Sequence, residues 1–152
     1  MEFGADTYQR GALERIGEAR VLMEHGDFTG SIYLGGVAVE GMLRSLHWLR
    51  DKAFDPRHDL KRIAVRIRDL GLLQSGTRDD DFVATVQEVA QNWSNDLRFA
   101  DNAKTQRWLF KKRAIRKDQE RFLKKACADH LERCFEVVER CKVLWQRHRR
   151  RS

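Results

Sequence analysis

Apolar residues along this chain recur at helical spacing, and they are densest between Gly30 and Leu49. At 3.6 residues per turn this stretch carries two neighbouring apolar rows, which leave little of the helix circumference polar. The rows are Ile32, Gly36, Val39, Leu43 and Leu46, and Leu34, Ala38, Met42 and Leu49. A helix with so wide an apolar surface belongs in the centre of a domain, and its glycines indicate close approach of another backbone.

One polar row remains on this central helix, and it contains Tyr33, Glu40, Arg44, His47 and Asp51. Glu40 and Arg44 are four residues apart, so their side chains can form an ion pair on one helical face. Ion pairs of this kind are more often structural than functional. We therefore interpret this pair as a satisfied contact on a partly exposed side of the helix.

The remaining pattern predicts four more helices around the central one, which should start after the N-cap residue Asp27 and end near Asp51. The four cover about residues 8–25, 59–71, 80–93 and 115–147, with Asp59 and either Asp79 or Asp80 as N-caps and Trp108 as an alternative start of the last helix. Residues 92–105 break the periodicity and predict an irregular connection. The sequence thus predicts one all-α domain over residues 1–152, an up-and-down bundle of about five helices, with 147–152 as a frayed basic tail.

The last predicted helix keeps a seven-residue repeat. One heptad position holds cysteines and another holds large apolar residues, namely Cys127, Cys134 and Cys141, and Leu131, Val138 and Trp145. This repeat predicts near-parallel packing along the bundle or across a dimer interface. Seven residues at a rise of 1.5 Å separate successive thiols by about 10 Å, so no two can share a metal ion or a disulfide within one chain. We expect reduced, buried cysteines and a homodimer.

Charge is distributed unevenly along the 152 residues. The formal charge is +7, and residues 104–125 alone hold ten Lys and Arg against Asp118 and Glu120, a net charge of +8. This asymmetry favours a polyanionic partner, with nucleic acid ahead of a membrane. The candidate contacts are Trp108, Lys111, Lys112, Arg113, Arg116 and Lys117. Cations can bind phosphates and an exposed ring can stack on bases, but a solvated helix face explains the same pattern equally well.

Several classes of function find no support in the sequence. No segment reaches the apolar length of a membrane span, and the N-terminus lacks the basic-then-apolar pattern of a signal peptide, so we expect a cytoplasmic protein without a membrane partner. We identify no Gly-rich phosphate loop, no His/Cys ligand cluster and no Ser–His–Asp arrangement. The sequence therefore predicts neither a metal site nor a cofactor.

Three segments together resemble the HEPN domain family. Residues 27–40 are similar to its small-residue helix that ends in Ala-Val-Glu, His58-Asp59-Leu60 to the opening of its next helix, and Leu97-Arg98-Phe99 to its Arg-Tyr turn before the last helix. The resemblance covers roughly residues 10–145. It implies a compact helical bundle, often homodimeric, that binds RNA or nucleotide or partners a small nucleotidyltransferase. Some members are metal-independent ribonucleases with an Arg-x(4–6)-His motif.

That ribonuclease motif is not well placed in this chain. Arg20 and His25 match it, but a chain with this many arginines gives such matches by chance, and they lie in the first helix. The better placed arginine is Arg98, where Lys104 and its neighbours stand in place of the histidine and Phe99 replaces the tyrosine. Lysine at an ordinary pKa cannot act as the base that RNA cleavage needs. The sequence therefore favours a non-catalytic protein.

Three functions stay open at this point. The first is a non-catalytic module that dimerises and binds RNA or nucleotide through its basic side. The second is a ribonuclease toxin with an atypical catalytic set, for which the candidates are Arg98, His58 and Glu40. The third is a protein-interaction partner of a minimal nucleotidyltransferase, in the manner of a toxin–antitoxin pair. The resemblance also suggests a cleft lined by Arg98, His58, Arg44 and Glu40, in which His58 is equally well explained as a helix-entry residue.

Overall fold

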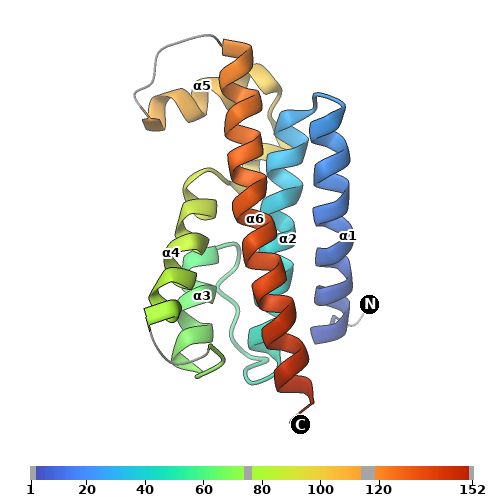
Figure 1. Cartoon of the computed structure of the whole chain (residues 1–152), viewed down its shortest axis with the longest axis vertical. Helices are drawn as coiled ribbons and strands as arrows, with labels where there is room; N and C mark the ends of the chain where they lie inside the picture. Colours follow the sequence, from blue (N-terminus) through green and yellow to red (C-terminus); the bar gives the residue numbers. More distant parts are fainter. Residues whose placement is uncertain (1–2, 74–76, 114–118, 151–152) are drawn as a thin grey trace.

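The computed structural model describes residues 3–73, 77–113 and 119–150, and all regular structure in these ranges is helical. Figure 1 shows long helices packed side by side, with α5 at one end of the bundle and both chain termini near the other. The elements are α1 (Ala5–Glu24), α2 (Phe28–Trp48), α3 (Leu60–Asp69), α4 (Thr77–Gln91), the 3-10 helix η1 (Asn95–Phe99), α5 (Asn102–Arg113) and α6 (Gln119–Arg149). The predicted helical bundle with a long C-terminal helix is confirmed.

Helix α2 is the centre of the bundle and packs against α1, α3 and α6. Gly36 lies under the ring of Trp93, so that a β carbon at this position would come within 2.1 Å of Trp93 Cδ1. At Gly35 a β carbon would lie 3.0 Å from Leu131 Cδ2 of α6. At these two glycines large side chains make the close approach. At Gly41 the predicted backbone approach is present, since a β carbon there would lie 3.3 Å from the carbonyl oxygen of Tyr8 in α1.

The connection between α2 and α3 runs back along α2. At its start the carbonyl of Asp51 contacts His47, whereas His58 at its end reaches Glu40, which lies two turns earlier in the helix. Arg66 of α3 then bonds to the carboxylate of Asp51. Because of this returning connection, α3 runs parallel to α2, as Figure 1 shows. The apolar stripe of α3 is buried in the core of the bundle.

The heptad residues of α6 are buried within the chain itself. Cys127, Cys134 and Cys141 are each 0 % exposed, and the large apolar residues of the neighbouring heptad position are buried as well. Burial raises the pKa of the Cys127 thiol to about 11 and that of Cys141 to about 12, which keeps both protonated near neutral pH. The repeat therefore reflects near-parallel packing of α6 along the bundle. This was the first of the two predicted explanations, the other being a dimer interface.

Three predicted boundaries are wrong. Helix α4 begins at Thr77, ahead of the expected aspartate caps. Much of the connection predicted as irregular is helical, since the Ser94 hydroxyl caps η1 by accepting the N–H of Asp96 at 3.2 Å and α5 already begins at Asn102. Trp108 belongs to α5, whereas the long helix α6 is described only from Gln119 onward; the alternative start at residue 115 lies outside the described residues.

The predicted frayed tail is also partly wrong. Helix α6 continues to Arg149, whose guanidinium forms an ion pair with Asp6 of α1 and lies 4.9 Å from the ring centre of Trp145. His148 Nε2 lies 2.9 Å from the carbonyl of Leu72. Contacts with two other parts of the bundle thus hold this end in helical form, while residues 151–152 lie outside the described part of the chain.

Candidate functional site

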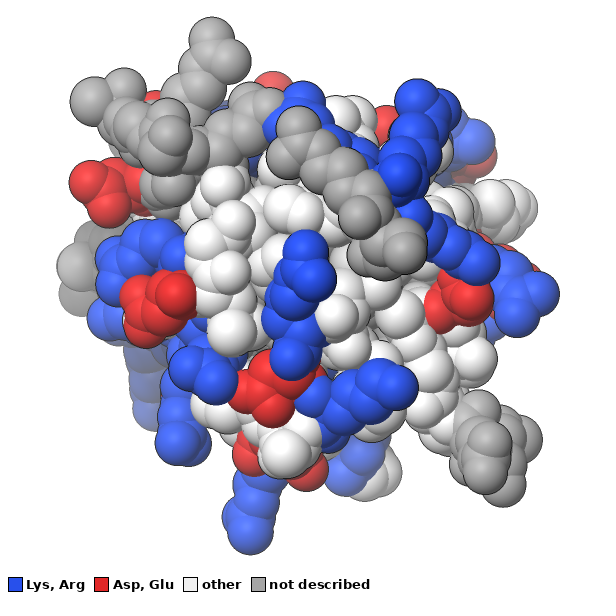
Figure 2. All heavy atoms as spheres, turned by 90° about the horizontal axis from the view of Figure 1, so that it is seen from below, with Lys and Arg blue, Asp and Glu red and all other residues white. Residues whose placement is uncertain are grey.

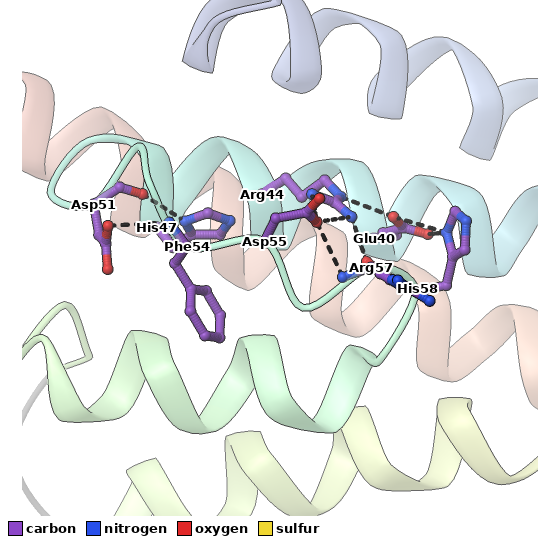
Figure 3. A network of polar contacts seen from close by, with 8 residues as sticks. All are labelled: Glu40, Arg44, His47, Asp51, Phe54, Asp55, Arg57 and His58. Carbon is purple, nitrogen blue, oxygen red and sulfur yellow. Dashed lines mark hydrogen bonds and ion pairs between the residues drawn. The ribbon is translucent and has the colours of Figure 1, made fainter.

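The polar row of α2 meets the returning connection at Glu40, whose side chain is 11 % exposed. Arg44 Nε donates to Glu40 Oε1 at 2.8 Å, and His58 Nδ1 lies 2.9 Å from Oε2. The same guanidinium donates to Asp55 Oδ1 at 3.3 Å and to the carbonyl of Arg57 (Figure 3). The predicted Glu40–Arg44 pair is confirmed, and it also fastens the connection to α2.

This cluster consists of the Glu40–Arg44 ion pair with one histidine at its edge. Burial by itself lowers the pKa of Arg44, but the hydrogen bond and charge of Glu40 raise it above its usual value overall. His58 is 54 % exposed at its side chain, and the carboxylate beside Nδ1 favours the tautomer with hydrogen on that atom. Its Nε2 atom then keeps a lone pair, which is the arrangement of a histidine base oriented by a carboxylate.

A second cluster lies at the other end of the connection, around the fully buried His47. His47 Nδ1 lies 3.0 Å from the carbonyl of Asp51, which makes Nδ1 the donor and leaves Nε2 as a buried acceptor without a partner among the described residues. Phe54 packs edge-on against the imidazole with 5.7 Å between ring centres (Figure 3). Burial lowers the pKa of His47, so the ring is held neutral.

Arg98 does not join the predicted cleft. Among the described residues, no hydrogen bond or ion pair connects it with Glu40, Arg44 or His58. Its guanidinium instead lies 4.6 Å from the ring centre of its neighbour Phe99. The structure thus brings together three of the four predicted cleft residues and places the fourth in a different, exposed arrangement.

The predicted basic run divides into residues with different environments. Lys112 Nζ donates to the carbonyl of Gln91, the last residue of α4, at 2.8 Å and lies 4.1 Å from the ring centre of Trp108. Burial lowers the pKa of Lys112. Trp108 is half-buried against the core, and Lys112 joins α5 to the end of α4. Lys111 is exposed, whereas the side chain of Arg113 and all of Arg116 and Lys117 lie outside what the structure describes.

Three cations form a row on α5 that the sequence pattern alone did not predict. Lys104, Arg107 and Lys111 are all exposed, and at 100° per residue they fall within about 60° of the helix circumference. None of the three has a carboxylate partner among the described residues. We call these three residues the α5 stripe. Their spacing of three and four residues was the signal available in the sequence, but it required knowing that a helix already starts at Asn102.

Polar contacts to the start of α2 and to the turn before it fix the position of α5. Asn102 Oδ1 accepts the N–H of Thr29 at 3.0 Å, and its Nδ2 donates to the carbonyl of Gly26 at 3.1 Å. The Thr29 hydroxyl lies 2.9 Å from that of Thr105, which is fully buried. Since these contacts join α5 to the turn between α1 and α2, the α5 stripe is carried on a helix with a defined orientation.

Cations at the opposite end of the bundle are arranged differently. Figure 2 views the bundle from below and shows Lys and Arg scattered over this face, several of them next to acidic side chains. Arg149 pairs with Asp6 there, and Arg66 Nη2 lies 2.6 Å from Asp51 Oδ2. Such pairs reduce the field available to an external anion, so the α5 end is the better candidate for a nucleic-acid interface.

Two further observations concern the described ranges 3–73, 77–113 and 119–150. No helix in them is long and apolar enough to cross a membrane. They also contain no group of three or more His, Cys, Asp and Glu side chains that could hold a metal ion.

Comparisons of the chain with known proteins leave its family open, so the resemblance to HEPN domains rests on residues 27–40, 58–60 and 97–99. Neither protein-family models, nor curated proteins, nor solved structures give a match to this chain.

Proposed function

We propose that this chain is a non-catalytic helical module that binds RNA through the exposed face of α5. The observation that carries the proposal is the α5 stripe, in which Lys104, Arg107 and Lys111 lie in a row about 10 Å long without carboxylate partners among the described residues. Cations in such a row can contact successive phosphates, and each contact releases counterions from the nucleic acid. The local excess of positive charge in residues 104–125 supports the same conclusion.

The test is the salt dependence of RNA binding. Fluorescence anisotropy with a labelled ten-nucleotide oligouridylate, measured between 50 and 200 mM NaCl, gives the slope of log K against log salt. Each phosphate contact with a single strand contributes about −0.7, so three contacts contribute about −2 to this slope. The triple variant Lys104→Glu, Arg107→Glu, Lys111→Glu should bind much more weakly and lose that part of the slope.

A second triple variant controls for total charge. Arg20, Lys52 and Lys61 are exposed, lie on α1, on the α2–α3 connection and on α3, and have no ion pair among the described residues. Their reversal to Glu changes the net charge by the same amount as reversal of the α5 stripe. We expect this variant to bind RNA nearly as well as the parent. Equal loss in both variants would show that only total charge attracts RNA, and the proposal would then be wrong.

Metal-independent RNA cleavage is a second candidate function, and one contact favours it. His58 Nδ1 lies 2.9 Å from Glu40, which orients an exposed imidazole as a general base. The purified chain should then cleave RNA in the presence of EDTA, and His58→Ala should abolish cleavage while leaving binding intact. An uncleaved RNA that is nevertheless bound supports the non-catalytic proposal instead.

Two partner predictions from the sequence continue as proposals. A homodimer was expected because the central helix and the α6 heptad offered more apolar surface than a small bundle covers, but Ile32, Leu43, Leu131 and Val138 are all buried within one chain. A nucleotidyltransferase partner rests on the family resemblance alone. Sedimentation at micromolar concentration tests the dimer, and a purely monomeric species would exclude it.

A further inference from the structure

Phe99 is the most exposed of the large hydrophobic side chains described, at 76 %. It ends η1, one residue after Arg98, whose guanidinium lies 4.6 Å from the centre of its ring. Arg98 is itself exposed. The pair therefore presents a flat apolar ring and a stacked cation to solvent. This exposure is unusual, because burying a phenylalanine side chain is favourable and most phenylalanines are largely buried in folded proteins.

The segment that carries this ring is well anchored. Leu97, at 5 % exposure, and Trp93, at 6 %, fix η1 to the bundle from within. The Trp93 Nε1–H donates to the carbonyl of Tyr33 at 3.0 Å, and the indole lies against Gly36. After Phe99 the chain passes through Ala100 and Asp101 into α5. Phe99 is thus an exposed ring on a fixed support.

We infer that Phe99, with Arg98 stacked beside it, is a platform on which an unpaired base of single-stranded RNA stacks. The inference rests on the proposed function and specifies its ligand as single-stranded RNA rather than a duplex. Aromatic rings and arginine planes are the groups on which splayed bases stack in single-strand recognition. Bases inside a duplex already stack on each other and present only their edges.

The position of the ring fits a continuous contact with the α5 stripe. Lys104 lies five positions after Phe99, and a chain of that length spans at most about 18 Å. The stripe then extends another 10 Å or so along α5 to Lys111. A single strand whose base stacks on Phe99 can therefore place neighbouring phosphates along the stripe, so that stacking and charge act on one oligonucleotide.

The experiment compares Phe99→Ala with the parent in anisotropy titrations of ten-nucleotide oligoadenylate and of a ten-base-pair RNA duplex. Loss of one stacked base typically weakens binding roughly 5- to 150-fold. We expect that loss for the single strand at every salt concentration with an unchanged salt slope, because stacking releases no counterions. Binding of the duplex should change less than 2-fold. The parent should also change the fluorescence of a 2-aminopurine base in the strand, and Phe99→Ala should not.

Three further variants make the result specific. Phe99→Tyr keeps a flat ring and should retain binding, whereas Phe99→Leu keeps apolar bulk without a ring and should not. Phe3→Ala removes a 51 % exposed ring elsewhere on the surface and should have no effect. If Phe99→Ala or Phe99→Leu binds the single strand as tightly as the parent, the stacking platform is excluded even though salt-dependent binding through the α5 stripe persists. If the parent binds no RNA at all, both the proposed function and this inference fail.

Discussion

The indole of Trp93 lies on the α carbon of Gly36, and its Nε1–H donates to the carbonyl of Tyr33, three residues earlier in α2. The hydrogen bond fixes the ring in the place where a β carbon would otherwise be. A side chain at position 36 would come within 2.1 Å of Trp93 Cδ1, so the ring would have to leave both the helix surface and its hydrogen bond. This contact joins the end of α4 to the centre of the bundle.

We therefore predict that Gly36→Ala is strongly destabilising, by about 3 kcal/mol in the free energy of unfolding, because overpacking here cannot be relieved by a small shift. For a domain of this size that corresponds to a fall of about 6–12 °C in Tm. Urea denaturation followed by circular dichroism measures the first quantity and calorimetry the second.

Gly17→Ala is the matched control for this prediction. Gly17 lies inside α1, and a β carbon there would meet nothing within 4 Å. Alanine is favoured over glycine in helices, so this variant should be more stable than the parent by about 0.5–1 kcal/mol. Similar effects of the two substitutions would show that Trp93 does not hold α2 and α4 together as described.

Local sequence signals predicted the beginnings and ends of several helices. Asp27 and Asp59 accept N–H groups from Gly30 and Arg62 at 2.8 and 3.0 Å, as N-caps should. Gly26 follows α1 with φ of 81°, a conformation that glycine adopts without strain. These features depend only on residues a few positions apart, which is why one sequence was enough to predict them.

Other features depend on contacts between distant residues, and the sequence could not predict them. Periodicity alone could not separate α5 from α6, since apolar and basic residues alternate through both. Lys112 looked like a surface cation, and its contact with the end of α4 follows only from how the helices pack. The same holds for His58 and Glu40, which are 18 residues apart, and for the exposure of Phe99.

The ion-pair cluster gives a second prediction. Glu40→Ala removes the carboxylate that contacts both Arg44 and His58. The largely buried guanidinium of Arg44 is then left with only the exposed Asp55 as an anionic partner. Breaking a buried pair from one side is costly, so we expect a loss of about 2–4 kcal/mol in unfolding free energy, measured in urea. Chain cleavage by a protease within residues 49–59 should become faster as well, since the connection loses its attachment.

A double-mutant cycle tests whether the cost arises from the pair itself. Glu40→Leu with Arg44→Met replaces the pair by apolar side chains of similar length. This double variant should lose less stability than the sum of the two single variants, because neither charge is left buried alone. Strict additivity would contradict a direct interaction between the two side chains.

The contact of Lys112 with α4 gives a third prediction. Its ammonium group donates to the carbonyl of Gln91, where the unpaired carbonyls of a helix end favour a cation. Lys112→Ala should lower the unfolding free energy by about 0.5–1 kcal/mol. The adjacent Lys111 is exposed and has no ion pair among the described residues, so Lys111→Ala should stay within about 0.5 kcal/mol of the parent. A larger loss of unfolding free energy for Lys111→Ala than for Lys112→Ala would show that Lys112 has no structural role.

The buried imidazole of His47 gives the last prediction, which concerns pH. Burial lowers the pKa of His47 in the folded chain, with Arg44 and Arg66 adding to the shift, while Asp51 opposes it. The unfolded chain therefore binds more protons below a pH of about 6.5, and stability should fall from there as the pH is lowered towards the folded pKa, by at most about 1.4 kcal/mol per pH unit for one proton.

The measurement is the urea midpoint of the parent and of His47→Gln at several pH values between 5.0 and 7.5. Glutamine cannot take up a proton, and its amide can still donate to the carbonyl of Asp51, which His47 Nδ1 contacts at 3.0 Å. At pH 7.5 the variant should be less stable than the parent, because it packs less well against Phe54. The difference in urea midpoint between parent and variant should narrow as the pH falls, because only the parent loses stability by keeping this imidazole neutral. A gap that stays constant or widens would mean that His47 is free to ionise in the folded chain.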